Sequence, residues 1–334
     1  MKHLITVLLA LALFGCGPAP DEGMDDQADA SETAMDESTE QDDAMERAGE
    51  ASMEESMDES MDASMSKDTD RLDQVLEAQP EEVRARFDAR HPRETLEFFG
   101  IEPGMTVVEG LPGGGWYTRI LVPYLGSDGK VIAANYAMDM WPHFPFGTEE
   151  FVEQMRQWPE MFPEEAKQWC DDDCAPVSTF YMGSLPDELA GTADAAVYVR
   201  LLHNLARFQK DGIDDYLDDA LADAFAVLKP GGTFGVVQHE ARAGMPDEWA
   251  DGNAGYLKKS FVVERAEAAG FELVDESDIN SNSDDRPSAD EVVWRLPPSL
   301  RVPEDAENAE ALKGQYEAIG ESNRMTLKFR KPEA

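Results

Sequence analysis

The chain has 334 residues, of which 70 are Asp or Glu and 28 are Lys or Arg, so its formal net charge at pH 7 is −42. Such a charge argues against binding to the phosphate backbone of nucleic acids and favours a well-solvated surface. The length is sufficient for one large domain with appendages.

The first 16 residues read MKHLITVLLALALFGC, with a basic start and an apolar run too short for a permanent membrane span. We predict that they form a signal peptide. The segment Leu13–Cys16 resembles the box of bacterial lipoproteins, whose Cys becomes the lipidated first residue of the mature chain. The resemblance implies a membrane anchor at Cys16 in the cell envelope. Gly17 after the Cys implies the outer membrane, with the protein facing the periplasm. An ordinary cleaved signal with an incidental Cys is the alternative.

Residues 17–66 carry 18 acidic side chains, one Arg and no aromatic residue. Such a segment buries too little apolar surface to offset its ordering entropy, so we predict a disordered acidic tether. Its Met residues recur every four positions, at 53, 57, 61 and 65. Thioethers bind soft metals, but a drifted repeat in a solvated linker is the simpler interpretation.

Residues 67–334 are predicted to form the folded domain. The first predicted elements are cap helices at 70–77, 81–89 and 91–99, a strand at 105–109, a helix at 116–125 and a strand at 130–135. An aromatic-rich insertion, predicted to be irregular, follows at 137–175, either as core or as a lid. Within it, Cys170 and Cys174 are predicted to form a small-loop disulfide, since a signal peptide implies an oxidising compartment. A metal clip is the alternative.

The rest of the domain continues the alternation of strands and helices. Strands are predicted at 177–181, 193–199, 233–238, 271–275 and 325–329, and helices at 213–228 and 256–269. Repeated β–α alternation predicts a parallel sheet with helices on both faces. The last two strands can close one edge as an antiparallel pair.

A glycine-rich turn stands at the first strand-to-helix junction. Residues 107–118, VVEGLPGGGWYT, read as a buried strand, an acidic residue, the turn and the start of a helix. Bare backbone N–H groups and a helix N-terminus beside a carboxylate suit a ligand with a polar head and a ribose.

Two segments carry a resemblance to a known family. VVEGLPGGG resembles the first motif of class I S-adenosylmethionine-dependent methyltransferases, and LKPGGTFGVV resembles the entry to their fifth strand. The match extends over about 85–334. It is closer to a subgroup of secreted, uncharacterised predicted methyltransferases, which read similarly at ARHPRETLEFFGIEPGMTVVE and PGGGWYTRILVPYL. The resemblance implies a Rossmann-like, seven-stranded methyltransferase sheet with an antiparallel closing pair, the cofactor S-adenosylmethionine and a small-molecule substrate. It leaves the oligomeric state open.

The resemblance also implies the cofactor-binding residues, which are Glu109, Gly110, Gly113, Gly115, Asn135, Ser184 and Arg200. The chain departs from the family pattern at three positions. Leu111 replaces a glycine of the first motif, and Asn135 replaces the acid that usually contacts the ribose. Ser184 stands where an acid usually contacts the adenine.

Two histidines follow neighbouring strands at the expected ligand edge. His203 comes after the strand at 193–199 and His239 after the strand at 233–238. Either is a candidate general base, with activity rising through pH 6–7. A metal held with Glu240, or hydrogen bonding to local backbone, are the alternatives, and no metal site is predicted. A serine-hydrolase elbow and a nicotinamide fingerprint are both missing from the sequence. The rival functions are a non-catalytic nucleoside-binding or sensing lipoprotein and a structural envelope lipoprotein.

Overall fold

The computed structural model describes residues 71–303 and 306–333, which belong to the compact unit Lys67–Ala334. The predicted signal peptide at 1–16, with Cys16, and the predicted tether at 17–66 lie outside the described residues. Across the described ranges, no helix combines the length and the apolar character that a membrane span requires.

One seven-stranded sheet organises the unit, in the order β3-β2-β1-β4-β5-β7-β6. Pairing is parallel from β3 through to β5, and β7 pairs antiparallel with both β5 and β6. The strands are β1 (Thr106–Gly110), β2 (Lys130–Asn135), β3 (Val177–Tyr181), β4 (Ala193–Val199), β5 (Leu228–His239), β6 (Glu272–Ser277) and β7 (Arg324–Arg330). This is the Rossmann-like methyltransferase sheet with its antiparallel closing pair, so the predicted fold class is confirmed.

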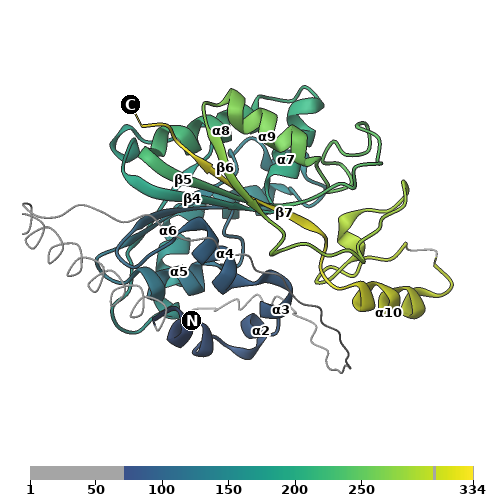
Figure 1. Cartoon of the computed structure of the whole chain (residues 1–334), viewed down its shortest axis with the longest axis horizontal. Helices are drawn as coiled ribbons and strands as arrows, with labels where there is room; N and C mark the ends of the chain where they lie inside the picture. The colour runs from purple at the N-terminus through teal and green to yellow at the C-terminus, as the bar shows by residue number, and fades with distance from the viewer. Residues whose placement is uncertain (1–70, 304–305, 334) are drawn as a thin grey trace, which may run out of the picture. The chain divides into compact units, whose positions relative to one another are not determined.

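Helices cover both faces of the sheet. Figure 1 shows α4, α5 and α6 on one side of the strands and α7, α8 and α9 on the other. The helices are α2 (Glu81–Arg84), α3 (Phe87–Arg90), α4 (Pro92–Phe99), α5 (Thr118–Leu125), α6 (Glu149–Ala166), α7 (Leu202–Lys210), α8 (Tyr216–Val227), α9 (Lys259–Ala268) and α10 (Ala309–Ile319), and residues 71–77 are also helical.

The central strands are buried on both faces. Val107 packs in the cluster that holds α4 and α5, whereas the next residue, Val108, packs in the cluster that holds α7 and α8. Because successive side chains of a strand point to opposite faces, Glu109 points to the α5 side and Gly110 to the α7 side. The strand period therefore decides where the acid of the glycine-rich turn lies.

The insertion at 137–175 is not irregular as predicted, because it contains the 18-residue helix α6. Thr148 caps the helix through its hydroxyl, which accepts a hydrogen bond from the Phe151 backbone N–H at 3.2 Å. Pro159 and Pro163 lie inside the helix. Prolines usually end helices, so these two obscured the helical pattern in the sequence. The apolar face of α6 packs on β3.

The helix α7 and the start of β5 also differ from prediction. No helix was expected between β4 and the helix predicted at 213–228, yet residues 202–210 are helical. The segment KPGG at 229–232, which separates the predicted helix at 213–228 from the predicted strand at 233–238, belongs to the first part of β5, beside a register shift between β4 and β5. Because Gly231 lies at φ +77°, it accommodates this irregularity without leaving the sheet.

The predicted disulfide between Cys170 and Cys174 is confirmed. It closes a loop whose Asp173 carboxylate accepts hydrogen bonds from the Arg71 guanidinium at 2.8 Å and from the Ser127 backbone N–H at 2.9 Å. These hydrogen bonds lower the pKa of Asp173. The loop thus joins the end of the insertion to the first described helix and to the end of α5.

We expect the double variant Cys170→Ser, Cys174→Ser to lose about 2 kcal/mol of unfolding free energy or less, since a loop this short removes little unfolded-state entropy. Urea denaturation of both proteins measures the loss. Mass spectrometry of unreduced wild-type protein is the control, and two free thiols there would contradict the pairing.

Candidate functional site

The glycine-rich turn lies where the strand order reverses, between β1 and its two neighbours β2 and β4. In open α/β sheets, ligands bind in the crevice outside the carboxyl ends of the strands at this point. Glu109, at the end of β1, is 5% exposed, and its Oε2 accepts a hydrogen bond from the Thr118 hydroxyl at 2.5 Å. Burial raises the pKa of Glu109 to about 7, although the hydrogen bonds from Thr118 oppose the shift.

The glycines of the turn serve different purposes. A Cβ at Gly110 would collide with the Tyr198 ring at 2.4 Å, and one at Gly115 with the Trp169 indole at 2.1 Å. These two glycines therefore make room for side chains of the chain itself. By contrast, nothing lies within 4 Å of a Cβ at Gly114, and only the Leu111 carbonyl lies at 4.0 Å from one at Gly113. Among the three glycines predicted to bind the cofactor, Gly113 is the one whose backbone is open to a ligand.

Leu111 adopts a left-handed backbone conformation, which the glycine usual at this position of the motif would adopt easily. Its φ is +49°, which costs a residue with a Cβ roughly 1–2 kcal/mol. The conformation is held by a hydrogen bond from the Leu111 N–H to the Ala134 carbonyl at 2.7 Å, and the side chain packs on the core. The turn is thus preserved without the glycine.

The two residues that replace acids occupy different surroundings. Asn135 is buried at the end of β2, and its Oδ1 accepts a hydrogen bond from the Tyr136 backbone N–H at 2.9 Å. Ser184 is exposed in the turn after β3. That turn is held by the Asp223 carboxylate of α8, which accepts a hydrogen bond from the Gly183 N–H at 2.6 Å.

His203 and His239 lie together, with ring centroids 5.4 Å apart, and both are buried. Nδ1 of His203 lies 3.4 Å from the Gln238 amide nitrogen, and Nδ1 of His239 lies 2.5 Å from the Ser322 hydroxyl. Burial lowers the pKa of His203 to about 3 and that of His239 well below its usual range. Both rings are therefore neutral at physiological pH. The rise of activity expected at pH 6–7 for an ordinary histidine moves to more acidic pH.

Arg200, in the left-handed conformation at φ +58°, follows β4 directly. Its guanidinium belongs to a cluster that the sequence did not predict, in which four arginines surround the Glu321 carboxylate. We call it the arginine cluster. Its members are Arg86 from the turn between α2 and α3, Arg90 of α3, Arg200, Arg324 of β7 and Glu321. Tyr117, at the start of α5, lies close enough to interact electrostatically with Arg90, Arg200 and Arg324.

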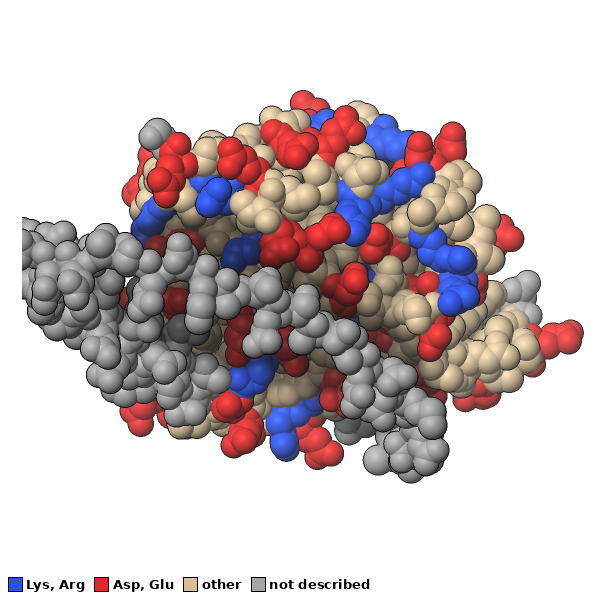
Figure 2. Space-filling view, in the orientation of Figure 1, with Lys and Arg blue, Asp and Glu red and all other residues tan. Residues whose placement is uncertain are grey.

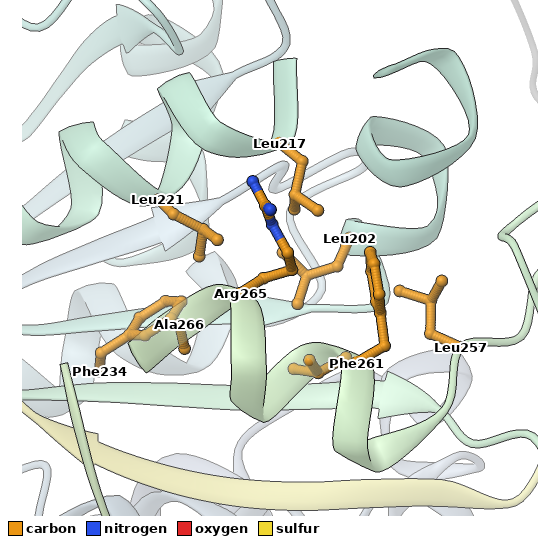
Figure 3. A pocket seen from close by; sticks show the side chains of 9 residues that line it. Leu202, Leu217, Leu221, Phe234, Leu257, Phe261, Arg265 and Ala266 are labelled. Atoms are coloured by element: carbon orange, nitrogen blue, oxygen red, sulfur yellow. The ribbon is translucent and has the colours of Figure 1, made fainter. Parts of the chain in front are cut away.

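A hollow with an apolar lining lies elsewhere, between β5 and the helices α7, α8 and α9 (Figure 3). Its cavity volume is only about 10 Å³, and it is partly open to solvent. Leu217 and Leu221 of α8 face Phe261 of α9 across it, and Arg265 lies among them with its guanidinium paired to Asp218. None of the predicted cofactor or catalytic residues lines it, so it is separate from the glycine-rich turn.

A second, polar hollow of about 220 Å³ opens beyond the end of β5. Its lining residues are Arg242, Asn282, Ser283, Asp285, Arg286 and Asn323. Within residues 71–303 and 306–333, no group of three or more His, Cys, Asp or Glu side chains is arranged to hold a metal ion. His203, His239 and Glu240 therefore do not form such a group.

No family model matches the sequence, and no curated protein matches it. Among solved structures, the chain is similar to the [4+2]-cyclase SpnF, with 18% identity, coverage of 74% of this chain and 81% of that chain, and a TM-score of 0.42. The chain is also similar to a chain of the complex between the Haloferax volcanii Trm112 methyltransferase activator and the putative methyltransferase. The identity is 18%, the match covers 78% of this chain and 98% of that chain, and the TM-score is 0.43. For a SAM-dependent methyltransferase from Aquifex aeolicus, the identity is 19%, the match covers 63% of this chain and 93% of that chain, and the TM-score is 0.41. Similarity this remote carries no argument about activity, and the strand order defines the fold.

We expect Glu109→Gln to remove a pH dependence of stability. Because the folded-state pKa of about 7 lies above the ordinary glutamate value of 4.5, the unfolded state ionises first as pH rises, and folding weakens between these two values. The wild type should lose about 3 kcal/mol across this window relative to the variant.

Urea denaturation at pH 4.5 and pH 8 measures the difference. Glu102→Gln, at an exposed position, is the matched control and should follow the wild type. Parallel pH profiles of wild type and Glu109→Gln would contradict the raised pKa.

Proposed function

We propose that the protein binds S-adenosylmethionine at the turn after β1 and transfers its methyl group to a small molecule. One observation carries the proposal. The open backbone at Gly113 and the buried Glu109 carboxyl stand together at the switch point of a methyltransferase sheet. Such a position is the ligand-binding crevice of doubly wound folds.

The residues present fit the polar end of this cofactor. The open backbone at Gly113 and Gly114 admits a ligand, and Glu109 can accept a hydrogen bond from an amino group. A bound cation there favours the ionised carboxylate and so reverses the raised pKa of Glu109. The cofactor supplies an electrophilic methyl group. The chain positions the two reactants and excludes water.

The histidines support methyl transfer as neutral groups. Because His203 is uncharged above a pKa of about 3, its ring accepts or donates hydrogen bonds and takes up a proton only weakly at neutral pH. An acceptor that is already ionised would need no stronger base. Catalysis would then rest mainly on positioning.

Two observations favour the rival function, a nucleoside-binding or sensing module without turnover. The Asn135 Oδ1 that would meet a ribose hydroxyl already accepts a hydrogen bond from the neighbouring backbone N–H. The Trp169 indole fills the face of Gly115. Both reduce the contacts left for a tightly bound cofactor, and they keep this function as the second candidate.

We also propose that the mature protein is anchored by a lipid at Cys16 and faces the periplasm from the outer membrane. The lipoprotein-like box at Leu13–Cys16 and the acidic segment after it support this location. Two signals or more are generally needed for stable anchoring, and lipoprotein maturation adds several acyl chains to one Cys.

We expect calorimetry on the purified full-length chain to detect S-adenosylhomocysteine binding that Gly113→Val weakens roughly tenfold or more, equal to about 1.4 kcal/mol, because the new side chain projects into the open face. Gly191→Val is the matched control. It has a similar positive φ and open surroundings but precedes β4, so it lies at the opposite ends of the strands from the glycine-rich turn. Lack of wild-type binding at millimolar ligand would refute the cofactor proposal.

Cys16→Ser should release the protein from membranes or block its processing, because the hydroxyl cannot carry the thioether-linked lipid. Fractionation and detergent partitioning measure the outcome. Cys170→Ser, the same chemical change within the folded unit, should leave the distribution unchanged. A variant at Cys16 that still partitions into detergent like wild type would exclude lipid anchoring there.

A further inference from the structure

The arginine cluster joins segments that are remote in the sequence around one carboxylate. Glu321 Oε1 accepts hydrogen bonds from Arg86 Nε at 2.8 Å and Arg90 Nε at 3.2 Å. Glu321 Oε2 accepts one from Arg324 Nη1 at 3.2 Å. Arg200 Nη1 is more distant, at 3.8 Å from the same Oε2. Three guanidinium groups thus hydrogen-bond to the two carboxylate oxygens, and the fourth, that of Arg200, makes only a longer ion pair.

The cluster contains more positive than negative charge. Every ion pair that the described residues give to these four arginines ends on Glu321, so four positive charges meet one negative charge. Arg90 and Arg324 are almost fully buried. Isolated charges are expensive to bury, and burial lowers the pKa of Arg90 well below its usual range and that of Arg200 to about 10. On the face shown in Figure 2, Lys and Arg lie among many Asp and Glu.

Arg200 is the most exposed member of the cluster, although most of its side chain is buried. Its side chain is 28% exposed, whereas its Nε is buried and has no hydrogen-bond partner among the described residues. A second donor, beside the cluster, also lacks a partner. Trp116 Nε1 is buried without an acceptor in the described part of the chain, and Cζ of Arg90 lies 4.4 Å from the centroid of the Trp116 ring. Buried donors normally have acceptors, so these two donors, set in an excess of positive charge, can serve an anion that enters the cluster.

The location of Arg200 connects this charge to the ligand crevice. The residue follows β4, which pairs with β1, and Glu109 and Gly110 of β1 lie in register with Val197 and Tyr198 of β4. Tyr117, two residues after Gly115, lies within electrostatic range of Arg90, Arg200 and Arg324. The excess positive charge therefore adjoins the start of α5, beside the glycine-rich turn.

We propose that Arg200 and the arginine cluster form a binding site for a carboxylate or phosphate group of a ligand held in the crevice between β1 and β4. Arg200 presents its guanidinium to the anion, and Arg90 and Arg324 supply the field behind it. Guanidinium groups bind both anions through paired hydrogen bonds. The anion belongs either to the amino-acid part of the cofactor, in which case the inference rests on the proposed function, or to a separate anionic substrate.

Calorimetry on the full-length chain, with wild type, Arg200→Gln and Arg200→Lys, tests the site with three probes. The probes are S-adenosylhomocysteine, 5′-methylthioadenosine, which lacks the amino-acid carboxylate, and inorganic phosphate. Arg330→Gln is the matched control, because it removes an exposed arginine at the far end of β7. Far-UV circular dichroism checks that each variant folds.

A cofactor carboxylate predicts that Arg200→Gln weakens S-adenosylhomocysteine about tenfold or more, as for a lost hydrogen bond to a charged group, and leaves 5′-methylthioadenosine unchanged. A substrate anion predicts that the wild type binds phosphate, that Arg200→Gln weakens this binding as much, and that S-adenosylhomocysteine is unaffected. Arg200→Lys should show a smaller loss, since it keeps the charge without the fork.

Two results would overturn the anion site. In the first, wild type and Arg200→Gln bind all three probes equally. In the second, neither protein binds phosphate, and Arg200→Gln binds both nucleosides as tightly as wild type does. Those results leave the cofactor proposal standing if S-adenosylhomocysteine still binds. Conversely, phosphate binding that depends on Arg200, with neither nucleoside bound, supports the anion site and removes the cofactor proposal.

Discussion

The Glu321 carboxylate is the constraint on which the arrangement of this site depends. It accepts hydrogen bonds from Arg86 and Arg90, 235 and 231 residues away along the chain, and from Arg324 at the start of β7. The cap helices are thereby tied to the antiparallel strand that closes the sheet. Buried ion pairs contribute little net stability when complete, but losing one partner leaves the others uncompensated. The network therefore specifies placement more than it adds stability, and what it places is the wall of the crevice beside the glycine-rich turn.

The central sheet could be predicted from the sequence because its strands satisfy local rules. The bounds of β2, β3 and β4 agree with prediction, since strands buried on both faces read as continuous apolar runs between turn signals. The helices α6 and α7 were missed for local reasons too. Two prolines interrupt α6, and α7 follows β4 with only two intervening residues, so strand and helix patterns merge. Where local signals conflict, tertiary packing decides, and single-sequence patterns do not contain it.

The candidate site divides in the same way. Glu109 and Gly113 lie where the strand–turn–helix pattern places them, because one short segment determines their positions. Trp169 and Glu321 could not be found from the sequence. Each reaches the crevice from a distant segment, and nothing in its local sequence separates it from surface residues of the same type. The alternating period of β1 did contain one usable signal, since it placed Gly110 against the opposite helix layer and so against Tyr198.

Two electrostatic imbalances of opposite sign meet at the first turn of α5. Thr118 donates a hydrogen bond to the Glu109 carboxyl, whose burial favours the neutral acid, and the preceding residue, Tyr117, lies within electrostatic range of the under-neutralised arginine cluster. A cation beside the first and an anion beside the second would each recover part of the cost of burial. A ligand that carries both charges on one small group, as an amino acid does, satisfies the two at once. With the cofactor and anion sites proposed above, consecutive residues at the start of α5 would together favour a zwitterionic ligand, which neither imbalance specifies alone.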